Sequence, residues 1–297
     1  MKPSPFTYHR PGTVQEAVEL LADLGEEGKV LAGGQSLVPL MSMRLAAPAN
    51  LVDINHLAEL DTVEVTGDGV RVGAVARHSR VEKDPAAFEA APLVRQGLLN
   101  VAHPTIRNRG TTVGSLVHAD PSAEMPAVLC LLGGSVELRS ATGSRTVEAA
   151  DFFVGPMESA LRTGELAVTA TFRRAPERSG STFVELARRH GDYAMCGVAA
   201  LVTVDPDGAM TGARLALISV GAVPIVVDVA PALNGTGTGF DDSGLRDLVD
   251  AAIDPEPDIH ATAEYRRHLA HVLTGRALTE ARDRAVSSRR HEKVSPR

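Results

Sequence analysis

The apolar positions of the first 56 residues combine helical spacing with short buried runs. Apolar residues recur every three or four positions over 14–24, after Thr13 and Glu16, which together fit a capping box. Short apolar runs at 29–32 and 50–54 are typical of buried strands. This pattern predicts a small β-α-β-α-β unit at the start of the chain.

The pattern changes after residue 56. Two alternating segments flank Thr66–Gly69, and another pair flanks Thr142–Gly143, so both predict β-hairpins. Helical spacing separates the hairpins, and a further strand is expected to end near Phe172. The expected strands are 62–65, 70–75, 135–139 and 145–147, and the expected helices are 79–90, 92–102 and 126–132.

A polar stretch at 173–180 breaks the pattern and indicates a domain boundary. Beyond it, apolar runs predict strands at 182–189, 195–204 and 212–221, with a turn at Asp205–Gly208 that favours an antiparallel sheet. Helices are expected near 243–253 and 258–274, and residues 281–297 are expected to be a disordered tail.

Composition narrows the class of protein. The 297 residues carry a net charge of −7 and only 3% aromatic residues, without tryptophan, which argues against nucleic-acid binding. The N-terminus lacks a signal-peptide pattern, and no apolar run approaches the roughly 18 residues of a membrane span, so a cytoplasmic location is expected. The two cysteines, Cys130 and Cys196, are too few for an iron–sulfur cluster, which needs about four ligands, and are interpreted as buried thiols.

Two glycine-rich segments interrupt the apolar pattern. Gly33-Gly34 precedes Gln35-Ser36, and Gly110–Ser115 repeats the combination of glycine with small hydroxyl residues. Rows of backbone N–H groups in such loops bind phosphate, and two of them would suit a dinucleotide. Two ordinary tight turns are the alternative, because the chain has neither a G-x-G-x-x-G motif after a strand nor a Walker A motif.

Four blocks of sequence resemble the FAD-binding medium subunit of molybdenum hydroxylases, the family of xanthine dehydrogenase and aerobic carbon monoxide dehydrogenase. They are AGGQS at 32–36, TIRNRGTTVGSLVHADPSAEMP at 105–126, DFFVGPMESALRTGEL at 151–166 and ARRHGDYAMCGVAA at 187–200. The resemblance extends from about Phe6 to about Leu278.

The resemblance implies an α+β fold. Residues 1–175 would form a two-subdomain FAD-binding domain of the vanillyl-alcohol oxidase/MurB (PCMH) type, with subdomains at about 1–56 and 57–175. Residues 180–280 would form a C-terminal domain, related to that of the carbon monoxide dehydrogenase flavoprotein, with a three-stranded antiparallel sheet and helices.

The resemblance also implies where FAD binds. The two glycine loops would hold the pyrophosphate, Glu124 a ribose, and Asp192 and Tyr193 the isoalloxazine ring. Val101 and Ala102 would line the adenine side and Leu166 the cofactor wall. The expected cofactor-binding residues are Lys29, Leu31, Ala32, Gly33, Gly34, Gln35, Ser36, Leu37, Val101, Ala102, Thr111, Val113, Gly114, Ser115, Val117, Glu124, Leu166, Asp192 and Tyr193.

One position departs from the family pattern. Relatives carry T-I-G-G-[NS], whereas this chain has Val113 at the first glycine. A β-branched residue does not readily adopt positive φ. Either this position has ordinary β geometry, or the loop stays farther from the pyrophosphate and binds FAD more weakly.

The function implied is that of an electron-transfer subunit. FAD here would receive electrons from two [2Fe-2S] clusters on a small partner subunit, after a large molybdopterin subunit oxidises the substrate, and pass them to an external acceptor. The assembly would be a dimer of heterotrimers, with catalytic chemistry carried by cofactors rather than by side chains of this chain. The alternatives are a free-standing flavin-dependent oxidase or reductase of the same fold and a flavin-free scaffold subunit.

Other residues with chemical potential receive plainer interpretations. His118 and Asp120 resemble an acid–base pair but are expected to have a structural role in their loop. His268 and His271 are expected on a helix surface rather than at a metal. The alternative for Tyr193 is packing in a domain interface.

Overall fold

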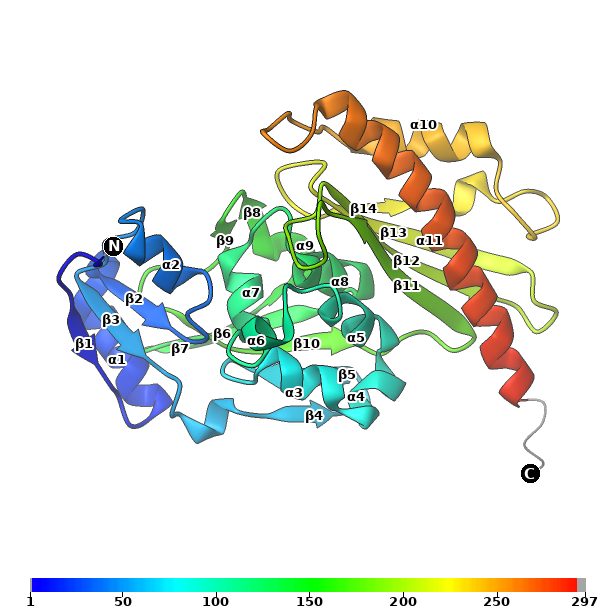
Figure 1. The fold of residues 1–297 in the computed structure, drawn as a ribbon. Helices are drawn as coiled ribbons and strands as arrows, with labels where there is room; N and C mark the ends of the chain where they lie inside the picture. Colours follow the sequence, from blue (N-terminus) through cyan, green and yellow to red (C-terminus); the bar gives the residue numbers. More distant parts are fainter. Residues whose placement is uncertain (1, 293–297) are drawn as a thin grey trace.

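The computed structural model describes residues 2–292, and Figure 1 shows three sheets in succession along the molecule. The first sheet is parallel, in the order β1-β3-β2, and confirms the predicted β-α-β-α-β unit. Its elements are β1 (Thr7–His9), α1 (Val14–Leu24), β2 (Gly28–Leu31), α2 (Leu37–Ser42) and β3 (Asn50–Asp53).

The start of α1 follows the predicted capping pattern with one difference. The Thr13 hydroxyl accepts the N–H of Glu16 at 3.1 Å. The Glu16 carboxylate accepts the N–H of Gly12 at 2.6 Å, one residue before the cap itself. Both contacts satisfy N–H groups near the helix start that have no intrahelical partner.

The second sheet has five antiparallel strands in the order β4-β5-β10-β6-β7, so the last strand lies between the two predicted hairpins. Pro85 divides the helix predicted over 79–90, and Asp84 caps the second piece through the N–H of Ala87. The strands are β4 (Val63–Val65), β5 (Gly69–Gly73), β6 (Ser135–Ser140), β7 (Gly143–Glu148) and β10 (Leu166–Arg173); a small ribbon contains β8 (Phe153–Gly155) and β9 (Glu158–Ser159). The helices are α3 (His78–Lys83), α4 (Pro85–Ala90), α5 (Pro92–Leu98), α6 (Pro104–Arg107), α7 (Thr112–His118), α8 (Glu124–Leu132) and α9 (Ala149–Phe152).

The third sheet is antiparallel, as predicted, but has four strands rather than three. The additional strand, β14 (Ile225–Asp228), pairs with residues 214–217 of the third expected strand. The other strands are β11 (Ser179–Leu186), β12 (Cys196–Val204) and β13 (Met210–Ile218), followed by α10 (Asp242–Ala252) and α11 (Ala263–Glu292).

Helix α11 contradicts most of the predicted disordered tail. It continues to Glu292, and only residues 293–297 of that segment lie outside the described residues. Ala281 and Ala285 are fully buried where α11 crosses the sheet (Figure 1). A side chain on Gly180 would lie 2.1 Å from the Ala281 carbonyl oxygen, so small residues on both elements let helix and strand backbones meet.

Alternate residues of β12 belong to two cores. Ala199 and Leu201 join the core of the five-stranded sheet and its helices, whereas Val198 and Val202 pack under α10 and α11. Both faces of this strand are buried, which explains its nearly continuous apolar sequence. The third sheet is therefore packed directly against the α5–α8 region of the second.

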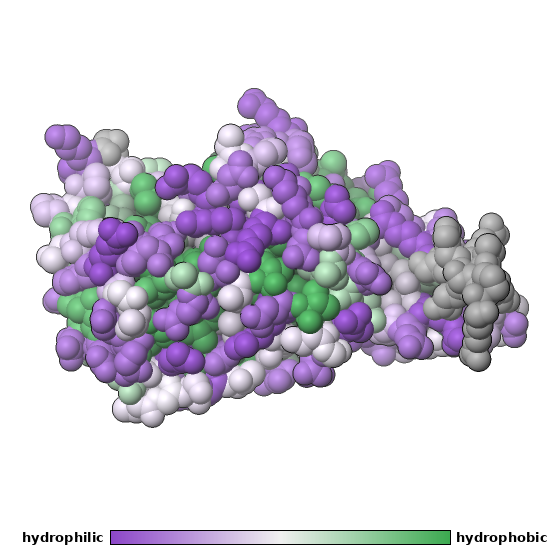
Figure 2. All heavy atoms as spheres, turned by 90° about the horizontal axis from the view of Figure 1, so that it is seen from below, coloured by the Kyte–Doolittle hydropathy of each residue, from purple (hydrophilic) through white to green (hydrophobic). Residues whose placement is uncertain are grey.

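The surface seen from below is mostly hydrophilic, with apolar side chains showing near its middle (Figure 2). Within residues 2–292, no helix has the length and apolar character needed to cross a membrane.

Candidate functional site

A cavity of about 440 Å³ lies where the three sheets approach one another. It is bordered by the two glycine loops (residues 32–36 and 110–115), the 119–124 loop with the start of α8, and the 187–195 loop between β11 and β12. Every cofactor-binding residue predicted from the sequence lines it except Leu31. The Leu31 carbonyl oxygen instead accepts the N–H of Ile54 within the first sheet.

The two adjacent glycines serve different purposes. A Cβ on Gly33 would lie 2.6 Å from the Arg109 carbonyl oxygen and 2.7 Å from the Gly110 Cα, so this residue permits direct backbone contact between the two glycine loops. Gly34 has φ of +70°, in the left-handed region that favours glycine. Together they turn the chain into α2 while keeping the loops in contact.

The second glycine loop begins a helix. Thr111 caps α7, and its hydroxyl accepts the N–H of Gly114 at 3.2 Å. A Cβ on Gly114 would approach that hydroxyl to 2.5 Å, so glycine is required here by the cap. Val113 lies in the first turn of α7 and is 2% exposed. Val113 therefore has neither a positive φ nor the β geometry that was one of the two alternatives: it is helical, a conformation that a valine adopts without strain.

His78 supports this loop from below. Its backbone N–H donates to the Gly110 carbonyl at 3.0 Å, and its ring contacts the Thr112 hydroxyl at 3.2 Å. Burial lowers the pKa of His78 to about 3, with a further contribution from Arg107. A neutral imidazole thus lies under the second glycine loop at physiological pH.

Carboxyl groups gather around the start of α8. Burial raises the pKa of Glu124 to about 8, and the nearby Glu185 on β11 adds to this effect. Burial likewise raises the pKa of Glu185 to about 7, and its Oε2 has no hydrogen-bond partner among the described residues. Asp120 accepts the N–H of Ser122 at 2.8 Å and shapes the loop that leads to Glu124.

The 187–195 loop forms another part of the cavity wall, through Gly191, Asp192 and Tyr193. Gly191 has φ of +90°, and a Cβ there would lie 2.5 Å from the His103 ring, so the loop rests on residues 102–103 of the second sheet's helical layer. Tyr193 is 67% exposed and lines the cavity, which excludes interface packing within this chain. The protein atoms around Tyr193 partly desolvate it and raise its pKa, and Asp120 and Glu124 add to this effect.

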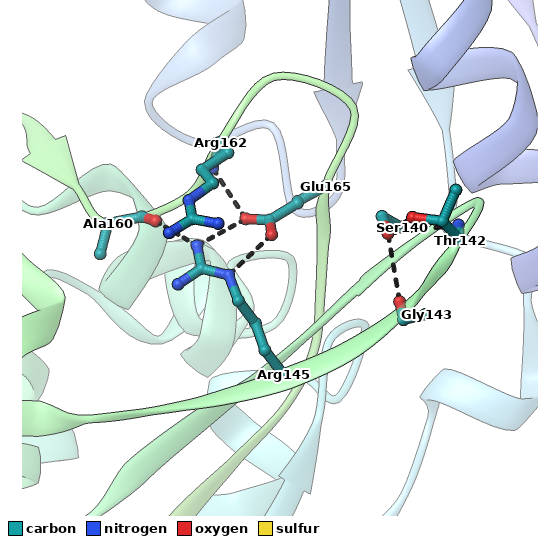
Figure 3. Close-up of polar contacts among 7 residues, drawn as sticks. All are labelled: Ser140, Thr142, Gly143, Arg145, Ala160, Arg162 and Glu165. Carbon is teal, nitrogen blue, oxygen red and sulfur yellow. Dashed lines mark hydrogen bonds and ion pairs between the residues drawn. The ribbon is translucent and has the colours of Figure 1, made fainter.

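A partly buried ion pair holds another wall of the cavity. Figure 3 shows Arg145 of β7 reaching Glu165 with two nitrogens, both at 2.7 Å, and the Ala160 carbonyl at 2.6 Å. The Glu165 carboxylate also accepts the N–H of Arg162 at 2.8 Å. This fork holds the 160–165 loop beside the strand and orients Leu161 and Leu166, which line the cavity.

The structure also brings in residues that the sequence did not assign. His118 and Asp120, expected to be structural, both line the cavity. Burial lowers the pKa of His118; Asp120 opposes this effect and Lys29 adds to it. The other additional lining residues are mainly apolar or small: Val30, Ile54, Ala74, Ile106, Ser122, Ala123, Met157, Leu161, Ala167 and Gly191, with His78 and Gly110 behind the second loop. Several of them lie within the family blocks at 105–126, 151–166 and 187–200 but were not assigned to the cofactor.

The remaining candidates lie elsewhere. His271 of α11 pairs with Asp250 of α10 at 2.9 Å, and His268 of α11 is exposed; neither histidine lines this cavity. Cys130 and Cys196 are free thiols whose pKa burial raises to about 12. In the part of the chain that the structure describes, no group of three His, Cys, Asp or Glu residues is placed to hold a metal ion.

Comparisons with known proteins agree with this geometry. Residues 4–172 match the model of the FAD binding domain in molybdopterin dehydrogenase, and residues 181–281 match the CO dehydrogenase flavoprotein C-terminal domain. The caffeine dehydrogenase subunit beta of Pseudomonas sp. (strain CBB1) is 39% identical over 293 residues, covering 96% of this chain and 98% of the relative. The carbon monoxide dehydrogenase medium chain of Afipia carboxidovorans is 35% identical over 289 residues, covering 96% and 99%.

Solved structures give the same result. Reconstituted CO dehydrogenase from Oligotropha carboxidovorans contains a chain that superposes with a TM-score of 0.89 at 33% identity, covering 96% of this chain and 100% of that chain. Sequence and structure therefore agree along nearly the whole length, and this chain belongs to the family of FAD-binding flavoprotein subunits of molybdopterin dehydrogenases.

Proposed function

We propose that this chain binds FAD in the cavity between its three sheets and serves as the electron-transfer subunit of a molybdenum hydroxylase. The direct contact of the two glycine loops at Gly33 carries the proposal. Only a backbone without side chains at this point leaves two rows of peptide groups side by side at the cavity wall, as a pyrophosphate requires. The apolar walls around Leu161 and Leu166 suit a flat aromatic ring system.

The residues of this chain would divide the binding of FAD among themselves. The glycine loops would hold the pyrophosphate, with Lys29 nearby, and Glu124 would bind a ribose through its buried carboxyl group. Val101 and Ala102 would line the adenine side, while Asp192 and Tyr193 would flank the isoalloxazine ring. FAD supplies the capacity to accept electrons singly or in pairs, and the chain binds it, orients it and limits its exposure to water.

The wider fold and assembly follow from the same proposal. Residues 1–175 would be a PCMH-type domain with subdomains at about 1–56 and 57–175, and 180–280 a second domain. The partners would be a small subunit with [2Fe-2S] clusters and a large molybdopterin subunit, assembled as a dimer of heterotrimers in the cytoplasm. Support comes from relatives described as medium or beta subunits of dehydrogenases, at matching length.

The visible spectrum of the purified chain, before and after denaturation, tests the cofactor assignment. We expect flavin absorption bands and release of FAD near one equivalent per chain, either as purified or after addition of FAD. A colourless protein that takes up no FAD, alone or with its partner subunits, would contradict the assignment. Turnover of a small substrate by the isolated chain would instead favour a free-standing flavin enzyme.

A further inference from the structure

Ser219 joins two loops of the cavity although it lies outside it. It directly follows β13, is 9% exposed and has φ of +63°, which is unfavourable for a serine. Its N–H donates to the Pro121 carbonyl at 3.0 Å, and its hydroxyl donates to the Ala194 carbonyl at 2.7 Å. Pro121 precedes the lining residues 122–124, and Ala194 follows Tyr193. One residue of the third sheet thus contacts the backbone of both loops.

Arg266 of α11 reinforces this junction. Its Nη1 donates to the Met195 carbonyl at 2.7 Å and to the Ser219 carbonyl at 3.1 Å, and the residue is only 6% exposed. Its Nη2 pairs with the Asp258 carboxylate at 2.7 Å, whereas its buried Nε lacks a partner among the described residues. A buried guanidinium that serves two loop carbonyls through one nitrogen fixes their separation.

Asp258 holds the guanidinium in place. Its carboxylate also accepts the N–H groups of His260 at 2.8 Å and Ala261 at 2.9 Å. Burial acts to raise the pKa of Asp258, but these N–H groups and Arg266 outweigh it and hold the pKa at about 2. The carboxylate therefore remains charged, and Arg266 remains paired, at every pH at which the protein is handled.

We propose that Ser219 and Arg266 form a bridge that sets the spacing between the 119–124 loop and the 187–195 loop, and that both are positioning residues for the cofactor. The inference rests on the proposed function, since it assigns these two loops to FAD. Within the described residues, the side-chain hydrogen bonds of Ser219 and the Nη1 bonds of Arg266 end on loop carbonyls at this junction. Both residues act through these loops, because neither lines the cavity.

Hydrogen exchange of the full-length chain without FAD tests the bridge independently of the cofactor. Ser219→Ala should accelerate amide exchange over 191–195 by about tenfold and leave 122–124 nearly unchanged, because the Ser219 N–H is retained. Arg266→Gln should accelerate exchange in both loops. Arg267→Gln is the matched control: the neighbouring arginine makes an exposed pair with Asp250 at 3.3 Å, and its loss should alter neither loop.

FAD affinity provides the second readout. Ser219→Ala should weaken FAD binding by about fivefold to tenfold and Arg266→Gln by more, with Arg267→Gln within twofold of wild type. Three results would overturn the inference. The first is unchanged exchange in both loops, and the second is uniform acceleration of exchange over the whole third sheet. The third is unchanged FAD affinity although exchange in the loops is faster. If wild type binds no FAD, the proposed function fails, and exchange still decides whether the bridge fixes the loops.

Two further variants cover the case in which the first ones do not fold. Ser219→Gly adopts the same φ without strain and also lacks the hydroxyl, so it should loosen 191–195 as the alanine variant does. Arg266→Lys keeps the charge and one donor toward the loop carbonyls, and it should restore part of the lost affinity. Wild-type exchange and affinity in both of these variants would contradict the bridge.

Discussion

The glycine loops and the 187–195 loop border the same cavity but are held by different interactions. At Gly33 the two glycine loops meet backbone to backbone, with no room for a methyl group. The 187–195 loop is held by hydrogen bonds from the side chains of Ser219 and Arg266. Close packing of Gly191 against the His103 ring also holds it. The first contact tolerates no change of size, whereas the second depends on individual hydrogen bonds.

This difference predicts how each side responds to change. A side chain at Gly33 would force the backbones of the two glycine loops apart. It should therefore lower both the stability of the chain and its affinity for FAD. At the 187–195 loop and the carboxyl groups near it, changes in hydrogen bonding or protonation should alter the stability of the chain or its affinity for FAD by smaller amounts. The Glu124 carboxyl makes that side sensitive to pH as well.

The largest effect is expected for Gly33→Ala. Its Cβ would lie within 2.9 Å of backbone atoms of Arg109, Gly110 and Thr111, none of which can rotate away. We expect a loss of about 4 kcal/mol in the free energy of unfolding and loss of FAD binding. Urea denaturation and FAD titration measure both quantities.

Two other glycines calibrate this experiment. Gly34→Ala introduces only the unfavourable positive φ and contacts with methyl groups of Leu31 and Val38 at 3.2 Å, so about 1 kcal/mol is expected. Gly67→Ala adds a Cβ with nothing within 4 Å and should be nearly neutral. If Gly33→Ala behaved like Gly67→Ala, the loops could not be in the contact described.

The next effect concerns pH. The folded-state pKa of Glu124, about 8, lies above the ordinary 4.5 because of burial, with added repulsion from Glu185 and Asp120 that exceeds the attraction of Arg107. The folded state therefore binds the additional proton. Its contribution to stability is complete below pH 4.5 and is lost as the pH rises through about 8. The chain without FAD should lose on the order of 3 kcal/mol from this group over that range.

Glu124→Gln should remove most of this loss, because an amide remains neutral at all these pH values. Urea denaturation at a series of pH values from 5 to 9 would show the flatter profile. Glu89→Gln, a change at an exposed glutamate of α4, is the control and should leave the slope as in wild type. An equal slope in wild type and Glu124→Gln would show that Glu124 is charged in the folded chain.

Sequence reasoning succeeded where the signal is local. The Thr13 cap and the two hairpins each depend on neighbouring residues, and the structure confirms them. The family blocks also pointed to cofactor-binding residues that lie far apart in the chain. All of these residues except Leu31 line the cavity.

Features that depend on packing between distant parts of the chain could not be predicted from the sequence. Helix α11 continues past residue 280 because Ala281 and Ala285 fit against Gly180, about a hundred residues earlier, which a polar terminal sequence does not reveal. The short strand β14 needs the edge of β13 to form. Ser219 and Arg266 carry no motif, and only tertiary structure shows that they reach the loops of the cavity.

Val113→Gly restores the family pattern and is expected to have the smallest effect of the three. Val113 is buried in the first turn of α7 with ordinary helical geometry, so glycine would remove apolar packing and weaken the helix. We expect a loss of about 2 kcal/mol in unfolding free energy with FAD affinity unchanged within about threefold. The stability of Val113→Ala should lie between that of wild type and that of Val113→Gly. Comparing the two variants then separates the effect of side-chain volume from the effect of backbone freedom. Tighter FAD binding by Val113→Gly at unchanged stability would contradict this, and would mean that the valine holds the second glycine loop away from the pyrophosphate.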